Sequence, residues 1–205
     1  KLSIQKNQIP LFVSIDQEGG RVFRRKPPFR QYPSYGKLGR AGSEELVMSN
    51  ALAMAEELIE IGVNMNMAPV LDVNTNPQNP IIGDRSFSSD SNMVSRLGTC
   101  IIKTFKEKGI IAVGKHFPGH GDTSSDSHLE LPVVNHNIKR LENIELKPFI
   151  HAFKNGLRAV MTAHVLYPAL DADYPATLSE RIIKNILRKK YGFDGVVITD
   201  DLEMK

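Results

Sequence analysis

The sequence lacks the features that mark disulfide-stabilised, membrane-spanning or nucleic-acid-binding proteins. It has one cysteine, Cys100, in 205 residues, so no disulfide forms within the chain and a reducing compartment is permitted. Tryptophan is absent, and no apolar run is long enough to span a bilayer. The net charge of +3 at pH 7 is too small to indicate a nucleic-acid partner, and we expect none.

What remains is the composition of an ordinary globular protein, with 41% hydrophobic and 24% charged residues. A chain of this length can bury a substantial core, so we expect a single domain over residues 1–205 and a monomer. No signal peptide is visible, but the chain begins with Lys1 rather than methionine. We therefore expect a cytoplasmic protein, with a secreted or cell-envelope protein as the alternative.

Apolar runs of strand length alternate with amphipathic segments of helix length. Strands are expected at residues 11–15, 63–73, 110–113, 159–163 and 195–199. Helices are expected at residues 42–61, 91–108, 141–156 with an interruption near Pro148, and 179–191. This alternation predicts a parallel sheet, and no Gly-x-Gly-x-x-Gly fingerprint follows the first strand to indicate nucleotide binding.

The charged motifs come directly after the predicted strands, which is where a (β/α)8 barrel builds its active site. Such a barrel takes about 250 residues. The predicted fold class is therefore α/β, a (β/α)8 TIM-type barrel that is incomplete in this chain because terminal strands and helices are lacking.

The densest group of ionisable side chains lies at residues 115–128, which read Lys-His-Phe-Pro-Gly-His-Gly-Asp-Thr-Ser-Ser-Asp-Ser-His. We interpret this run as an active-site loop fed by the strand before it, although a solvated surface turn has the same composition. A metal site is a further alternative, with the potential ligands His116, His120, Asp122, Asp126 and His128. The spacing fits no helical His-Glu-x-x-His motif, and no cysteine pair supports a metal.

Four motifs together resemble glycoside hydrolase family 3, in its β-N-acetylhexosaminidase (NagZ-like) branch. They are Asp-Gln-Glu-Gly-Gly-Arg-Val at 16–22, Gly-Asp-Arg-Ser-Phe at 83–87, the run at 115–128 with its Asp-Ser-His triplet, and the strand ending in Thr199-Asp200. The resemblance covers most of the chain, and the motifs follow one another in the expected order. It implies a family 3 N-terminal catalytic barrel domain, here as a fragment.

The resemblance also implies a retaining β-N-acetylglucosaminidase, which needs a carboxylate nucleophile and an acid/base. Asp200, at the end of a rigid strand, is the implied nucleophile; its alternative use is to cap the next helix. His128 is the implied acid/base, and Asp126 is its dyad partner. A histidine exchanges protons near neutral pH, and a carboxylate on the other ring nitrogen would fix its tautomer. Two alternative activities are those of a phosphorylase and of another family 3 β-glycosidase.

The same resemblance assigns sugar binding to five residues: Asp16, Arg24, Arg85, Lys115 and His116. For Asp16 the alternative is a turn cap, and for Arg85 it is a surface ion pair with Asp84 or Asp90. The implied partner is a carbohydrate, terminal β-linked N-acetylglucosamine on peptidoglycan-derived muramyl saccharides. No cofactor or metal is implied. Two alternatives belong to other functional classes. One is a metal-dependent hydrolase that uses the His/Asp loop, and the other is a non-catalytic sugar-binding relative.

Overall fold

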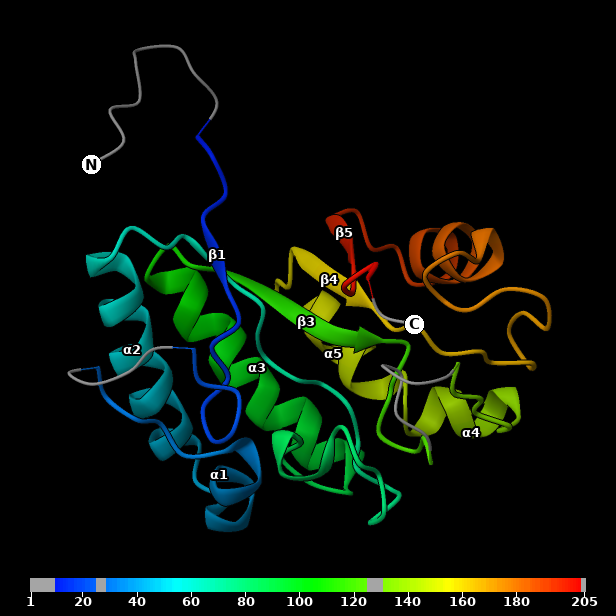
Figure 1. The fold of residues 1–205 in the computed structure, drawn as a ribbon, viewed down its shortest axis with the longest axis horizontal. Helices are drawn as coiled ribbons and strands as arrows, with labels where there is room; N and C mark the ends of the chain where they lie inside the picture. The colour runs from blue at the N-terminus through cyan, green and yellow to red at the C-terminus, as the bar shows by residue number, and fades with distance from the viewer. Residues whose placement is uncertain (1–9, 25–28, 125–130, 204–205) are drawn as a thin grey trace.

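The computed structural model describes residues 10–24, 29–124 and 131–203, which form an α/β fold around a five-stranded parallel sheet. Its strands are β1 Ser14–Ile15, β2 Met65–Asn66, β3 Ile111–Phe117, β4 Ala159–Thr162 and β5 Val196–Thr199. Each strand pairs with its neighbour in the sequence, so the sheet order is β1-β2-β3-β4-β5. This sequential winding makes the sheet a half-barrel, as Figure 1 shows.

Helices connect the strands and pack along one side of them. They are α1 Tyr35–Ala41, α2 Glu44–Glu60, α3 Ser91–Glu107, α4 Ile138–Asn143 and α5 Lys147–Lys154, with a 3-10 helix η1 at Gly83–Arg85 and a π-helix η2 at Arg181–Lys190. Helix α3 contacts both α2 and α5, so the three form a continuous layer (Figure 1). None of the helices in the described ranges has the length and apolar character needed to cross a membrane.

Local sequence explains where the helices begin and end. Ser43 caps α2 by accepting a hydrogen bond from the Leu46 amide at 3.2 Å, and Glu44 and Glu45 follow at the positive end of the helix dipole. The predicted helix at 141–156 is two helices. Pro148 lies in the first turn of α5, where a residue without an N–H group is tolerated.

The core has two parts, one on each side of the sheet. The larger part lies between the sheet and the helices and includes Leu97 of α3, Phe117 of β3 and Phe149 of α5, all fully buried. The smaller part, on the inner face, consists of Met65, Val113, Ala159 and Met161. Because side chains alternate along a strand, Lys115 shares the inner face with Val113, while an irregularity in the pairing between Gly114 and Phe117 lets Phe117 join the core on the helix side. The inner core therefore supports the polar groups at the strand ends.

The strands differ in length from those predicted. Strand β1 has only two residues, because the Asn64 side chain binds the Val13 amide and the Leu11 carbonyl, both at 2.8 Å. Strand β2 is also shorter than predicted, and Pro69 follows it. Strand β3 extends four residues beyond the predicted end and includes Lys115 and His116, for which the sequence predicts a loop. Both side chains are consequently fixed by a strand.

Candidate active site

The carboxyl ends of the parallel strands meet at one edge of the sheet, and a pocket of about 210 Å³ lies there. It is lined by Asp16, Val22, Arg24, Ile81, Arg85, Lys115, His116, His120, Met161 and Asp200. Six of these are site residues predicted from the sequence, and they come from positions 16 to 200 of the chain. The other two predicted residues, Asp126 and His128, lie outside the described residues.

A buried carboxylate, Glu18, forms the floor beneath this pocket. Both of its oxygens accept hydrogen bonds from Arg85, from Nη2 at 2.7 Å and from Nε at 2.9 Å. Lys115 Nζ lies 2.7 Å from the same carboxylate and 2.5 Å from Asp16 Oδ1. Two cations and two carboxylates thus neutralise one another, and the bidentate geometry fixes the plane of the guanidinium.

The charges in this floor shift the pKa of Glu18 strongly. Burial alone would raise it, but Lys115 and Arg85 together lower the pKa of Glu18 to about 2. The same carboxylate raises the pKa of Arg85 further above its usual value, against the effect of burial. Glu18 and Arg85 are therefore both charged at physiological pH, and the floor presents fixed donors to the pocket above it.

A second buried carboxylate, Asp72, holds the two histidines of the pocket. It accepts hydrogen bonds from the backbone amides of His116 at 3.1 Å and His120 at 2.6 Å. His116 Nδ1 lies 2.7 Å from Asp72 Oδ2. Because a carboxylate only accepts hydrogen bonds, this contact places the Nδ1 proton on His116 and directs Nε2 into the pocket. Burial would raise the pKa of Asp72, but His116 and these hydrogen bonds lower it.

His120 is held as a neutral ring. Its Nδ1 lies 2.9 Å from Thr123 Oγ1, and its ring meets that of His116 edge-on. Burial, with a smaller contribution from His116, lowers the pKa of His120 to about 4. His120 both shapes the loop after β3 and lines the pocket, so a neutral hydrogen-bonding group faces the ligand space.

Asp200 follows β5 directly and presents a half-buried carboxylate to the pocket. Its Oδ2 lies 3.9 Å from His116 Nε2, and its Oδ1 accepts a hydrogen bond from the Asp201 amide at 2.9 Å. The next turn is held by His164, whose Nε2 lies 3.0 Å from the Asp201 carbonyl oxygen. One oxygen of Asp200 therefore remains directed toward the ligand space, while the backbone around it is anchored.

The rim of the pocket is more open than its floor. Arg24 Nη2 lies 3.8 Å from Asp16 Oδ2, and both side chains are substantially exposed. Asp16 thus joins the exposed Arg24 to the buried Lys115. This arrangement leaves two partly hydrated polar groups at the mouth of the pocket, where a polyhydroxylated ligand could exchange hydrogen bonds with them.

The structure corrects one alternative and adds two residues to the predicted set. Arg85 pairs with neither Asp84 nor Asp90 on the surface; it binds Glu18 in the interior, and Asp84 lies 3.6 Å from Arg21 instead. Glu18 and Asp72 were not predicted. Each is an acid next to or within an apolar run of the sequence, residues 11–15 for Glu18 and residues 63–73 for Asp72, and that position was the available signal.

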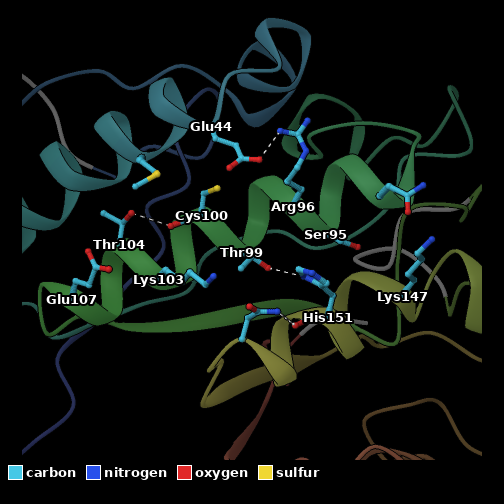
Figure 2. Close-up of a pocket in the computed structure, with 13 residues that line it drawn as sticks. Glu44, Ser95, Arg96, Thr99, Cys100, Lys103, Thr104, Glu107, Lys147 and His151 are labelled. Atoms are coloured by element: carbon cyan, nitrogen blue, oxygen red, sulfur yellow. Dashed lines mark hydrogen bonds and ion pairs between the residues drawn. The ribbon is translucent and has the colours of Figure 1, made fainter.

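A larger groove of about 520 Å³ lies on the opposite, helical side of the chain, along α3 (Figure 2). Arg96 donates a 2.8 Å hydrogen bond to Glu44 there, and Thr99 contacts His151 at 2.9 Å. Cys100 lies in the wall, and burial raises the pKa of its thiol, so it is not an activated nucleophile.

The described residues contain no group of three or more histidine, cysteine, aspartate or glutamate side chains arranged to hold a metal ion. The two pocket histidines direct Nδ1 to Asp72 and Thr123. Within the described ranges, the pocket is therefore a network of hydrogen-bonding and ionic groups.

Comparison with known proteins gives consistent matches over nearly the whole chain. The sequence model described as "Glycosyl hydrolase family 3 N terminal domain" matches residues 1–205. A beta-hexosaminidase A of Pseudoalteromonas piscicida is 40% identical over 97% of this chain and 36% of its own length. A beta-hexosaminidase of Tolumonas auensis is 41% identical over 96% of this chain and 59% of its own. The chain thus spans between about a third and three fifths of these relatives.

Solved structures agree with the sequence matches. A glycoside hydrolase family 3 beta-N-acetylglucosaminidase from Paenibacillus superposes with a TM-score of 0.94 at 50% identity, covering 96% of this chain and 38% of that one. NagZ from Neisseria gonorrhoeae, in complex with N-trifluoroacetyl-D-glucosamine, gives a TM-score of 0.89 at 38% identity, covering 94% and 58%. At these identities the likeness extends to the family as well as the fold.

Proposed function

The chain belongs to the glycosyl hydrolase family 3 N-terminal domain family, and on that premise we propose that the protein is a retaining β-N-acetylglucosaminidase. It removes terminal β-linked N-acetylglucosamine from peptidoglycan-derived muramyl saccharides. The observation that carries the proposal is the half-buried carboxylate of Asp200, which faces a small pocket floored by Lys115 and Arg85. On this proposal residues 1–205 belong to one catalytic barrel, to which the described residues contribute five parallel strands.

In the first step, Asp200 attacks the anomeric carbon while the glycosidic C–O bond breaks. The leaving oxygen takes a proton from the His128 imidazolium, and Asp200 becomes esterified to the sugar. In the second step, neutral His128 removes a proton from water, and the resulting hydroxide equivalent attacks the anomeric carbon and releases Asp200. Asp126, two residues before His128, holds the imidazole tautomer. The roles of His128 and Asp126 come from the family resemblance.

The described residues support the binding half of this mechanism. Lys115 and Arg85 are fixed cations whose remaining N–H groups can donate to sugar hydroxyls, and Asp16 can accept from them. His116 Nε2 lies between Arg85 and Asp200, at 3.5 Å and 3.9 Å, which suits a hydroxyl beside the anomeric carbon. Arg24 closes the rim. The pocket volume suits one sugar ring.

The test is to expose the full-length protein to an activated fluoro-sugar analogue of N-acetylglucosamine and to map the modified peptide by mass spectrometry. We expect a stable adduct on Asp200, abolished in Asp200→Ala and retained in the neighbouring control Asp201→Asn. A phosphorylase would form the same adduct but release it faster with inorganic phosphate than with water. Absence of an adduct, with turnover that is lost on adding a chelator, would instead favour a metal-dependent hydrolase.

A further inference from the structure

Residues 122 and 136 bracket the chain segment that contains Asp126 and His128, and both bracketing residues are described. Their side chains meet directly: His136 Nε2 contacts Asp122 Oδ2. The two positions are 14 residues apart, so the contact joins the two ends of the segment that separates them. Both side chains are only partly exposed, at 29% for His136 and 23% for Asp122, which shields the pair from solvent screening.

The start of this segment is fastened to the loop that follows β2. Thr75 Oγ1 donates to Asp122 Oδ1 at 2.6 Å, so each oxygen of Asp122 has its own partner. Thr123 is fully buried; its hydroxyl accepts from Asn79 Nδ2 and its carbonyl from Asn76 Nδ2, both at 3.1 Å. The backbone is consequently fixed up to three residues before Asp126.

The end of the segment is fastened to the loop that follows β4. The Val134 amide donates to the Leu166 carbonyl, and the Leu166 amide donates to the Pro132 carbonyl, both at 2.9 Å. His136 follows two residues later and turns back toward Asp122 rather than toward β4. Two separate loops thus hold the two ends, and the Asp122–His136 pair is the side-chain contact that ties one end to the other.

We propose that the Asp122–His136 pair, supported by Thr75, is a positioning device for the acid/base, an inference that rests on the function proposed above. General acid catalysis requires the donor to be within hydrogen-bond reach of the leaving oxygen, and a displacement of about 1 Å can cost roughly 100-fold in rate. A charge-assisted contact across the two segment ends limits such displacement. It also keeps both oxygens of the Asp122 carboxylate engaged.

The experiment compares His136→Ala, His128→Ala and the double variant in the full-length protein, using aryl N-acetylglucosaminides with good and poor leaving groups. We expect His136→Ala to lower kcat by about ten- to a hundredfold for poor leaving groups. Activated leaving groups need little protonation, so their rates and all KM values should stay near the parental values. The double variant should be no slower than His128→Ala, because both changes disable the same proton transfer.

Three further variants keep the test decisive. His151→Ala, which removes a histidine of α5 remote from the pocket, is the matched control and should behave as the parent. His136→Gln, which retains a donor for Asp122, should recover part of the lost rate. Thr75→Val, which removes the second contact to Asp122, should show the same dependence on leaving group if His136→Ala does not fold.

Two outcomes separate the positioning role from the proposed function. If His128→Ala depends on leaving-group quality while His136→Ala and Thr75→Val match the parent, the positioning inference is overturned and the proposed function stands. If His128→Ala itself shows no such dependence, His128 is not the acid/base. The proposed function is then wrong in this respect, and the positioning role that rests on it is wrong as well. A uniform loss for all substrates, accompanied by a higher KM, would assign His136 a merely structural role.

Discussion

Two polar hollows on this chain contain the same kinds of side chain but hold them differently. In the pocket at the strand ends, Arg85 lies 2.7 Å from Glu18, and their side chains are 13% and 2% exposed. In the groove along α3 (Figure 2), Arg96 lies 2.8 Å from Glu44, and their side chains are 46% and 43% exposed. The two ion pairs have nearly equal length, so distance does not distinguish them.

Burial and shared partners make the difference. Glu18 binds two cations and has a pKa of about 2, whereas Glu44 forms one solvent-exposed ion pair, with Arg96. Strand ends place Glu18 and Lys115 in the interior, where removing one charge leaves the others without compensation. The groove is the larger hollow, yet its charges are individually replaceable. Volume is therefore a poorer guide to a functional site than the mutual dependence of its charges.

The largest expected effect comes from breaking the buried floor. Glu18→Ala should lower the free energy of unfolding by about 3–5 kcal/mol, because it leaves Arg85 without a carboxylate and Lys115 with Asp16 alone. Glu18→Gln keeps the volume and one acceptor, so its loss should be smaller. Urea unfolding of both variants measures the effect. A loss below about 1 kcal/mol for Glu18→Ala would place this pair with ordinary surface ion pairs.

A second prediction uses pH to weaken the same floor without changing its shape. The pKa of Glu18 falls from 4.5 to about 2 on folding, so the native state binds fewer protons than the unfolded state in this range. The stabilisation is present above pH 4.5 and is lost as the pH falls through about 2; it amounts to about 3 kcal/mol. The measurement is the unfolding free energy of the parent minus that of Glu18→Gln at several pH values.

The pH comparison contains its own control. His120 also has a lowered pKa, about 4. The stability that its neutral ring contributes is therefore lost as the pH falls from 6.5 to 4, a higher pH range than that of Glu18. Because both proteins contain His120, that contribution cancels in the difference. A difference that changes between pH 6.5 and 4.5 but not below would assign the pH dependence to groups other than Glu18.

The sequence was sufficient to predict secondary structure where the residues that determine it are close together in the chain. The cap and acidic first turn of α2 lie within three residues of one another, and the structure confirms that helix almost to the residue. Strand lengths depended on distant partners instead. Residues 11–13 were predicted as strand, but the Asn64 side chain, rather than a neighbouring backbone, binds the Leu11 carbonyl and the Val13 amide. Lys115 was predicted in a loop, yet Pro69 and Leu71 pair with it and prolong β3.

The same distinction applies to the site. The motifs located six residues of the pocket, because glycine-rich turns and clustered charges after strands are visible in a single sequence. Glu18 and Asp72 were missed because their partners lie far away in the chain, from 44 residues for Asp72 and His116 to 97 residues for Glu18 and Lys115. A buried acid is recognised by what surrounds it, and the sequence reports only its neighbours along the backbone. The roles of Asp126 and His128 remain predictions.

The smallest expected effect comes from the groove. Arg96→Gln removes the exposed ion pair with Glu44 and should lower the unfolding free energy by at most about 1 kcal/mol, with turnover unchanged. Glu44→Gln should cost slightly more, because Glu44 also lies in the first turn of α2 and interacts favourably with the helix dipole. The matched change in the pocket, Arg85→Gln, leaves Glu18 buried beside Lys115 alone. If Arg96→Gln and Arg85→Gln were equally destabilising in urea, burial would not be what separates the two hollows.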